Sequence, residues 1–274
     1  MKKFKLVKLL CFGLIVASIS ACSSSAAKLT ISGSTSMAPL MEKLTKVYSE
    51  NSNEEIVLSP DGSSAGIKAA IEKVSDIGMS SRPLTTEELQ SGVVDYKVAI
   101  DAIGVVVNNK NSVKDLSMQQ LHDIFSKKIV NWKELGGEDL QIVLVSRESG
   151  SGTKSAFEET LDLIKEDKSS VVDSLGPITA NSTGAVIENV SQKEGAIGYI
   201  SVDSVDSKVK LLSIDKKIPA EKTISDGKYP LSRDFHLVYK EENKNVSSFI
   251  EYLQSNDGQE AIKEAGFVPV KAGK

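Results

Sequence analysis

The sequence has few cysteines and histidines, the residues that often form catalytic and metal-binding sites. It contains two cysteines, Cys11 and Cys22, and two histidines, His122 and His236, which both stand among apolar neighbours. No cysteine follows residue 22, so the folded part has no disulfide and must be stabilised by its hydrophobic core. So few histidines and cysteines argue against a transition-metal site or a histidine-containing triad. The sequence therefore predicts no metal, no cofactor and no catalysis.

The sequence also lacks an excess of positive charge. It has 33 lysines and arginines against 37 aspartates and glutamates, a formal net charge of −4, and four of the lysines lie within the first eight residues. The rest of the chain is more acidic still, which argues against binding to nucleic acid. An anionic ligand would have to be held by local dipoles and hydrogen bonds, because overall attraction is absent.

A run of apolar residues long enough to span a membrane comfortably is missing from the N-terminal region. Behind the four lysines, residues 9–19 form a short apolar run that is typical of a signal peptide, here residues 1–21. It ends in Ile19-Ser20-Ala21-Cys22, which resembles the lipobox of bacterial lipoproteins. We expect Cys22 to be acylated and residues 22–27, rich in serine and alanine, to form a flexible tether. An ordinary signal peptide with an incidental cysteine is the alternative.

Short β-branched runs alternate with amphipathic helical patterns from Lys28 onward. This alternation predicts an α/β fold with largely parallel sheets. The length is sufficient for one large domain or two lobes. Expected strands lie near residues 29–31, 55–58, 76–79, 98–107 and 141–145, and expected helices near residues 37–49, 65–74, 116–125 and 154–164.

Three junctions between an expected strand and an expected helix share one composition. They are Gly33-Ser34-Thr35-Ser36, Gly62-Ser63-Ser64-Ala65-Gly66 and Ser149-Gly150-Ser151-Gly152-Thr153. Serine and threonine at a helix start are ordinarily N-caps. Free backbone N–H groups, positive helix-dipole ends and hydroxyl donors also make an anion site. Because such junctions meet at the carboxyl ends of parallel strands, three of them together predict an anion-binding site.

Arg147 stands beside the third junction, just after the expected strand at residues 141–145. The planar guanidinium group donates two parallel hydrogen bonds to an oxyanion. A surface ion pair with the neighbouring Glu148 is the alternative role. We expect Arg147 to contact the ligand.

Two enzyme motifs come close to matching the same region. Ser151 and Lys154 fit the Ser-x-x-Lys pattern of acyl enzymes such as β-lactamases, but no Ser-Asp-Asn or Lys-Thr-Gly accompanies them. A phosphate-binding P-loop requires a glycine where Thr153 stands. An acyl enzyme therefore remains a minor alternative.

The motifs, in this order, resemble the phosphate-binding proteins of bacterial high-affinity phosphate ABC transporters. The resemblance covers nearly the whole chain after the tether. The matching segments are residues 33–39, 61–66, 76–82, 124–132, 147–153, 195–199, 258–259 and 266–269.

The resemblance implies a two-lobed periplasmic-binding-protein fold of type II, in which two strands cross between the lobes. Residues 99–107 are similar to the first crossing strand and residues 235–239 to the second. Lobe one would then hold residues 28–103 plus 231–274, and lobe two residues 104–230.

The resemblance also assigns phosphate contacts in both lobes, so that binding and lobe closure would be one event. The implied contacts are Thr35, Ser36, Ser63, Arg147, Ser151, Gly152 and Thr153. Weaker candidates from the same polar loops are Ser34, Asp61, Ser64, Ser80, Ser81, Asn181 and Ser182.

One position departs from the family pattern. Many members have an aspartate where Ser81 stands. A carboxylate accepts the proton that phosphate still carries near neutral pH, and it repels sulfate, which carries none. Asp61, directly before Gly62, could take over this acceptor role, or it could only form a turn.

The implied protein is a monomeric receptor that is tethered by lipid to the extracytoplasmic face of the cell membrane. It would capture inorganic phosphate and deliver it to the permease subunits of an ABC transporter. Two other binding roles remain open from the sequence. One is a receptor for sulfate or molybdate, and the other is a sensor or adhesin that works without a transporter.

Overall fold

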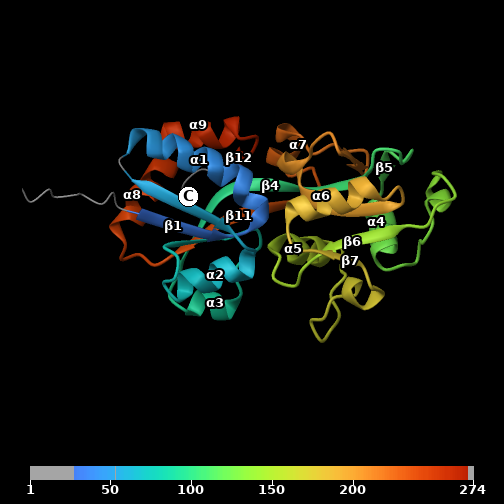
Figure 1. The fold of residues 1–274 in the computed structure, drawn as a ribbon, viewed down its shortest axis with the longest axis horizontal. Helices are drawn as coiled ribbons and strands as arrows, with labels where there is room; N and C mark the ends of the chain where they lie inside the picture. The colour runs from blue at the N-terminus through green and yellow to red at the C-terminus, as the bar shows by residue number, and fades with distance from the viewer. Residues whose placement is uncertain (1–27, 53, 271–274) are drawn as a thin grey trace, which may run out of the picture.

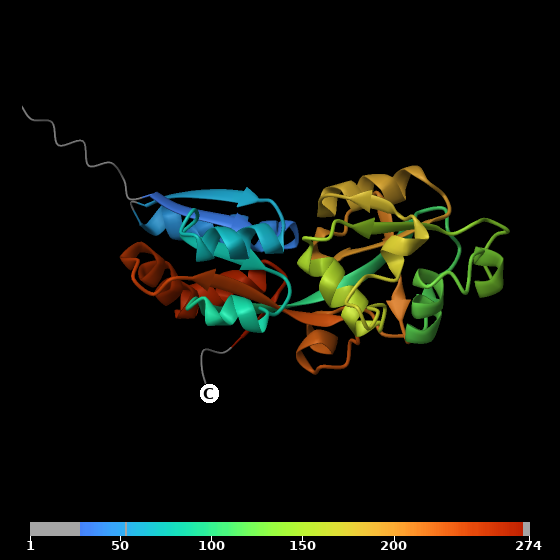
Figure 2. The same cartoon turned by 90° about the horizontal axis from the view of Figure 1, so that it is seen from below.

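The computed structural model describes residues 28–52 and 54–270. In it the chain forms two α/β lobes side by side, joined at a narrow waist (Figure 1 and Figure 2). The expected signal segment 1–21 and the tether 22–27, with Cys22, lie outside the described residues. In the part of the chain that the structure describes, no helix combines the length and the apolar character needed to cross a bilayer.

The sheet of lobe one has the strand order β2, β1, β3, β11, β4. β1 runs parallel to both β2 and β3, whereas β11 runs antiparallel to β3 and β4. The parallel strands alternate with helices along the chain, as the sequence predicts. The strands of this sheet are β1 (Lys28–Gly33), β2 (Glu55–Pro60), β3 (Ile77–Ser80), β4 (Val94–Asn108) and β11 (Ser232–Tyr239), and the short β12 (Val268–Pro269) pairs with β4.

Helices cover both faces of the lobe-one sheet (Figure 1). One face packs against α1, α8 and α9, where Leu40 and Leu44, one turn apart, and Phe249 belong to the same buried hydrophobic cluster as Leu29 and Ile31 of β1. The opposite face carries α2 and α3. The helices are η1 (Thr35–Met37), α1 (Ala38–Asn51), α2 (Ser63–Ile71), α3 (Thr86–Gln90), α8 (Lys244–Gln254) and α9 (Asn256–Glu264).

The sheet of lobe two continues from β4 in the order β8, β6, β7. β6 is parallel to β7 and β8, while β4 is antiparallel to β8 and β9. The strands are β6 (Val143–Arg147), β7 (Ile178–Ala180), β8 (Ala196–Ser201) and β9 (Val209–Leu211), with a separate parallel pair of β5 (Asp115–Leu116) and β10 (Ser213–Ile214).

An aromatic cluster fills the core of lobe two. Phe157 stacks on Tyr199 with ring centroids 4.0 Å apart, and Phe125 meets Phe157 edge-on at 4.9 Å. All three side chains are fully buried and join α4, α5 and β8. The helices of this lobe are α4 (Met118–Phe125), η2 (Trp132–Leu135), α5 (Gly152–Thr160), η3 (Val172–Leu175), α6 (Thr183–Gln192), η4 (Val202–Ser204) and α7 (Glu221–Ser225).

The waist consists of β4 and β11, which contain the expected crossing segments and extend beyond them. Their pairing is reinforced by a buried ion pair in which Arg233 donates to Asp101 at 2.8 and 2.9 Å. The Ser201 hydroxyl donates to the other Asp101 oxygen at 2.8 Å. Breaking such a pair leaves a buried charge without a partner. These bonds therefore hold β4 and β11 in register. The lobe boundaries at 103/104 and 230/231 stay a prediction.

A buried carboxyl on α5 gives the fold a pH dependence. Glu158 is 1% exposed, lies 4.0 Å from Lys154 Nζ, and accepts a hydrogen bond from Ser170 at 2.9 Å. Burial raises the pKa of Glu158 to about 7, although the charge of Lys154 and the Ser170 hydroxyl oppose the rise. The folded protein therefore keeps this proton at pH values where the unfolded chain, with the usual pKa of 4.5, has released it.

We expect the free energy of unfolding to fall as pH rises from about 4.5 to 7, because the folded state binds more protons in that window. The loss is at most about 3 kcal/mol. Glu158→Gln keeps the acceptor for Ser170 and removes the titration. Urea unfolding at pH 5 and pH 8 should show the variant matching the original protein at pH 5 and exceeding it at pH 8. An unchanged gap between the two proteins across this range would contradict the assignment.

Candidate functional site

The three Gly/Ser/Thr junctions lie together where the two lobes touch. The first follows β1 and the second opens α2, both in lobe one, while the third opens α5 in lobe two. The first turn requires glycine, because Gly33 has φ +132° and an added Cβ would lie 2.3 Å from the Met79 carbonyl oxygen. The shared composition therefore reflects one location in space.

Lobe one contributes a cluster of buried hydroxyls. Ser34 donates to Ser81 at 2.9 Å, and its Oγ lies 2.9 Å from that of Ser36. Ser81 Oγ lies 3.2 Å from Ser63 Oγ, which also accepts the backbone N–H of Ser81 at 3.1 Å. All four side chains are at most 3% exposed.

Lobe two contributes Arg147 at the end of β6. The residue is 1% exposed, and its side chain donates from Nε and Nη2 to the two oxygens of Glu148, each at 2.8 Å. Nη2 also donates to Thr35 Oγ1 at 3.1 Å, and the backbone N–H donates to the Tyr199 hydroxyl at 3.3 Å. Nη1 is buried without a hydrogen-bond partner among the described residues. The alternative ion pair with Glu148 is thus present, although it is buried and not on the surface. The expected contact of Arg147 with the ligand stays a prediction.

The start of α5 adds backbone donors to the site. Ser151 is the N-cap and accepts the backbone N–H of Lys154 at 3.3 Å. The positive end of the helix dipole therefore points toward the hydroxyl cluster. Thr153, also buried, donates to Ser36 at 3.3 Å. We call the polar groups of Ser34, Ser36, Ser63, Ser81, Arg147 and Thr153 the interlobe site.

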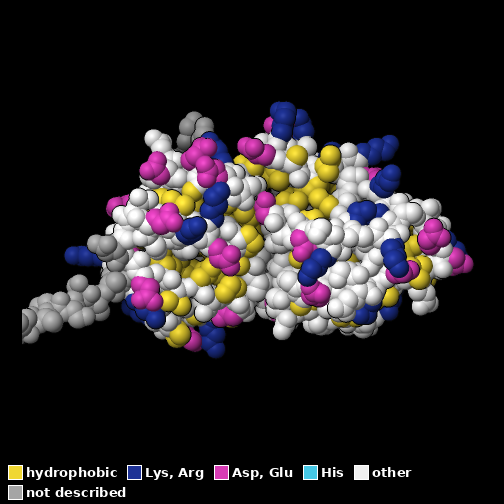
Figure 3. Space-filling view, turned by 45° about the horizontal axis from the view of Figure 1, so that its top comes forward, with side chains coloured by type: hydrophobic (Ala, Val, Ile, Leu, Met, Phe, Trp, Pro, Cys, Tyr) yellow, Lys and Arg dark blue, Asp and Glu magenta, His cyan; other side chains and the backbone are white. Residues whose placement is uncertain are grey.

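The two lobes are in direct contact around the interlobe site. Besides the bonds of Arg147 and Thr153, the backbone N–H of Ser64 donates to the Gly150 carbonyl at 3.1 Å. On the face drawn in Figure 3 the lobes touch, and charged side chains of both signs are scattered over both. The lobes are therefore closed on the site.

The weaker sequence candidates take different places. Ser34 and Ser81 belong to the interlobe site. Ser80 is buried but donates to the Arg82 carbonyl at 2.8 Å, so its hydroxyl is used locally. Ser64 accepts from the Arg82 guanidinium at 3.3 Å.

Two other weak candidates belong to the junction between β7 and α6. Ser182 caps α6 by accepting the backbone N–H of Ala185 at 3.1 Å. Asn181, the residue before it, is exposed. This junction does bring one residue to the site, Thr183, which the sequence analysis did not predict. Thr183 is buried, and its backbone N–H donates to Thr35 Oγ1 at 3.3 Å. The Asn-Ser-Thr-Gly run at this helix start was the available signal.

Asp61 lies next to the second junction, with its backbone N–H donating to the Gly33 carbonyl at 2.7 Å. The residue is exposed, and partial burial of its carboxyl raises the pKa above the usual value. Among the described residues, no side-chain hydrogen bond joins this carboxyl to the hydroxyl cluster. Its role as a proton acceptor stays a prediction.

The arrangement around Lys154 does not activate Ser151. Lys154 Nζ pairs with Asp173 and lies 4.0 Å from Glu158, while only the Lys154 backbone bonds the Ser151 hydroxyl. A general base at the nucleophile, which acyl transfer needs, is therefore not supplied by this lysine. Within residues 28–52 and 54–270, no group of three or more His, Cys, Asp or Glu side chains could hold a metal ion.

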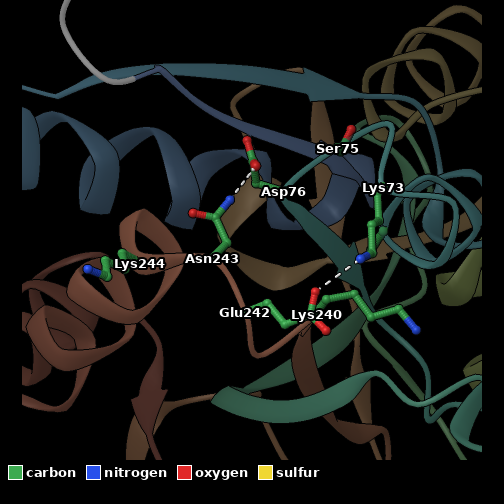
Figure 4. Close-up of a pocket in the computed structure, with 8 residues that line it drawn as sticks. Lys73, Ser75, Asp76, Lys240, Glu242, Asn243 and Lys244 are labelled. Carbon is green, nitrogen blue, oxygen red and sulfur yellow. Dashed lines mark hydrogen bonds and ion pairs between the residues drawn. The ribbon is translucent and has the colours of Figure 1, made fainter.

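A hollow of about 400 Å³ lies on lobe one, away from the interlobe site (Figure 4). Several of its polar groups bond one another, since Lys73 pairs with Glu242 at 3.1 Å and Asn243 donates to Asp76 at 2.6 Å. Asp76 also accepts the backbone N–H and the hydroxyl of Thr30, both at 2.7 Å. These groups tie the start of β3 to β1 and to the loop before α8.

Comparison with known proteins places this architecture in a family. A family model described as the PBP superfamily domain matches residues 20–257. The phosphate-binding protein PstS of Borreliella burgdorferi is 31% identical over 251 residues, which cover 88% of this chain and 90% of the relative. PstS of Bacillus subtilis is 36% identical over 250 residues, covering 88% and 80%.

Solved structures agree with this placement. A phosphate ABC transporter substrate-binding protein from Clostridium perfringens, solved with bound phosphate, is 39% identical with a TM-score of 0.83. The match covers 89% of this chain and 100% of that one. An ABC-type phosphate transport receptor from Vibrio cholerae is 35% identical with a TM-score of 0.72, covering 88% and 100%. The expected α/β, two-lobed binding-protein fold is confirmed.

Proposed function

Because this chain belongs to the PBP superfamily and, within it, to the phosphate-binding proteins of ABC transporters, we propose that it captures inorganic phosphate between its lobes and delivers it to a membrane transporter. The relatives are named for phosphate binding, and one of the similar structures contains phosphate. The interlobe site supplies the chemistry that this ligand requires.

The observation that carries the proposal is Nη1 of Arg147, which is buried without a hydrogen-bond partner among the described residues, while Nη2 of the same group donates to Thr35 of the other lobe. A buried N–H of a charged group is costly to leave unpaired. A tetrahedral oxyanion would accept from it, from the surrounding hydroxyls and from the backbone N–H groups at the start of α5. Such charge-assisted hydrogen bonds contribute about 1.5–3 kcal/mol each.

The proposed contacts span both lobes. We assign Arg147 the charged contact and the other positions hydroxyl or backbone N–H contacts. An anion held from both sides favours the closed form, because the open form would lose half of its bonds. The assigned set is Thr35, Ser36, Ser63, Arg147, Ser151, Gly152 and Thr153, joined by Ser34, Ser81 and Thr183.

The proposal includes a location and partners. The protein would be a monomer held by acylated Cys22 on the extracytoplasmic face of the cell membrane, where it meets permease subunits. The short apolar run before Cys22 and the lipobox-like residues support this part. It has no catalytic step. Labelling of cells with a fatty-acid analogue should mark the protein, and Cys22→Ala should abolish the label. Co-purification with the permease subunits would test delivery.

Calorimetric titration of the protein lacking residues 1–22 tests the binding function directly. We expect one phosphate per chain with micromolar or tighter affinity, since a handful of charge-assisted bonds outweighs the cost of association. The sample must first be stripped of ligand by partial unfolding and refolding. Absence of heat in refolded protein, shown to be native by circular dichroism, would refute the function.

A further inference from the structure

Tyr199, on β8, lies between the two elements of lobe two that reach the interlobe site. Its ring stacks on Phe157 of α5, with the two ring planes 15° apart. Its hydroxyl lies 2.8 Å from Ser146 Oγ and accepts the backbone N–H of Arg147 at 3.3 Å. Ser146 and Arg147 are the last two residues of β6, and Tyr199 is fully buried. One side chain therefore contacts both α5 and the end of β6.

The hydroxyl bond occurs where the sheet of lobe two opens. The pairing of β6 with β8 ends at Leu144 and Ile197, three residues before Arg147. On its other side, β6 stays paired with β7 as far as Arg147 and Ala180. The N–H of Arg147 donates to the Tyr199 hydroxyl, which here takes the place of a strand carbonyl. Because a buried N–H without an acceptor is costly, this hydroxyl fixes the end of β6.

The end of β6 and the start of α5 supply different donors to one anion in the proposed function. Arg147 supplies the guanidinium group, and α5 begins at Gly152 with its backbone N–H groups. The short turn between them is closed by the N–H of Ser151, which donates to the Glu148 carbonyl at 3.0 Å. One anion can accept from both elements only when their separation is right, because hydrogen bonds need about 2.7–3.2 Å between heavy atoms. A side chain that sets this separation therefore affects affinity without touching the ligand.

The ring and the hydroxyl of Tyr199 have separable roles. The ring packs with Phe125 and Phe157 in the aromatic cluster, and a phenylalanine would keep that packing. The hydroxyl alone bonds the end of β6. Burial raises the pKa of Tyr199 above its usual value, so the group keeps its proton. It can therefore donate to Ser146 while it accepts from Arg147.

We propose that Tyr199 is a positioning residue of the interlobe site, whose hydroxyl holds the end of β6, and with it the Arg147 guanidinium, at a fixed distance from the start of α5. The inference rests on the proposed phosphate-binding function, because it concerns how that site is preorganised. Tyr199 acts through Arg147 and not by contact with the anion.

The test begins with Tyr199→Phe, which removes the hydroxyl and keeps the ring. We expect phosphate binding to weaken about tenfold in calorimetry, the effect of about one lost hydrogen bond. The control is Tyr48→Phe in lobe one, since the Tyr48 hydroxyl donates to Glu54 at 3.1 Å and its ring meets Phe249 edge-on. This variant also loses a tyrosine hydroxyl beside an aromatic cluster, and its phosphate affinity should change less than about twofold.

A double-mutant cycle separates positioning from a general structural role. If Tyr199 acts through Arg147, Tyr199→Phe should weaken phosphate binding less than about twofold in protein that already carries Arg147→Ala, because the group it positions is gone. Equilibrium dialysis with labelled phosphate measures these weaker affinities. A purely structural effect would give the same tenfold loss with and without Arg147, and that result would overturn the inference.

Ser146→Ala is the second variant. It removes the other partner of the Tyr199 hydroxyl and leaves the aromatic cluster intact, so phosphate binding should weaken about threefold. Circular dichroism first establishes native structure, and if Tyr199→Phe does not fold, Ser146→Ala alone decides. Unchanged affinity in the folded variants would overturn the positioning role and leave the phosphate function intact. Absence of phosphate binding in the original protein would instead refute the function.

Discussion

Replacing Arg147 by alanine should weaken phosphate binding at least about a hundredfold, because truncating a buried, hydrogen-bonded charge costs about 2–5 kcal/mol. Arg147 is the cation of the interlobe site, and its loss removes the charge-assisted contact with the anion. The loss also leaves Glu148 without the partner that engages both of its oxygens. The remaining carboxylate then repels phosphate. The variant therefore loses an attractive contact with the anion and gains a repulsive one.

Arg82 provides the matched control for this experiment. Arg82 too donates two hydrogen bonds to the carboxylate of a glutamate, Glu88, and it lies one residue after Ser81 in lobe one. We expect Arg82→Ala to change the phosphate dissociation constant less than about fivefold, since a partly exposed pair contributes little at a distance. Both variants are compared by calorimetry, after circular dichroism has shown native structure. Retained affinity in Arg147→Ala, or equal loss in both, would contradict the site.

The alternation of strands and helices was enough to predict the fold class, but element ends depended on local backbone conformation. The expected helix 154–164 begins at Gly152 and ends at Thr160. Asp162, two residues later, has φ +55°, which a continuing helix does not allow. The β-branched run predicted strand 98–107, whereas β4 begins at Val94 because β11 pairs along its whole polar first part.

The sequence was sufficient to predict which strand-to-helix junctions form the site. It was not sufficient to predict which hydrogen bonds their side chains make. The rule that parallel strands end at one edge brings Ser36 and Ser63 together in lobe one. Thr153 joins them from lobe two, and that rule does not place it there. No sequence pattern shows that Ser80 bonds its own loop while the next residue, Ser81, joins the cluster of buried hydroxyls. Ser80 is the last residue of β3 and Ser81 the first beyond it, so the difference depends on the local conformation where the strand ends.

The meeting of the two lobes is the feature that sequence reasoning reaches only through family resemblance. Thr35 and Arg147 are separated by 112 residues, and their contact depends on the angle at which β4 and β11 cross the waist. No periodicity in the chain encodes that angle. The structure supplies it, and with it a test of whether closure itself provides affinity.

Gly152 is the point at which closure is most easily blocked. An added Cβ there would lie 2.4 Å from Ser63 Oγ and 3.0 Å from Ser63 Cβ, both across the lobe boundary. The Ser63 hydroxyl could rotate away, but it would then lose its bonds in the hydroxyl cluster, and the contact with Cβ would remain. Overpacking of this kind costs about 1–3 kcal/mol. We therefore expect Gly152→Ala to weaken phosphate binding about ten- to a hundredfold.

Gly150→Ala is the control that distinguishes blocked lobe closure from the loss of a flexible glycine in the same loop. It lies in the same loop, and a Cβ there would meet Ser64 Cβ at 3.8 Å, an ordinary contact. Gly150→Ala should therefore bind phosphate within about threefold of the original protein. Small-angle scattering then reports closure, because phosphate should reduce the radius of gyration of the original protein and of Gly150→Ala, but not of Gly152→Ala. Tight binding by Gly152→Ala with full compaction would show that the lobes close without the close approach of Gly152 to Ser63, and the interlobe geometry described above would not be the ligand-bound one.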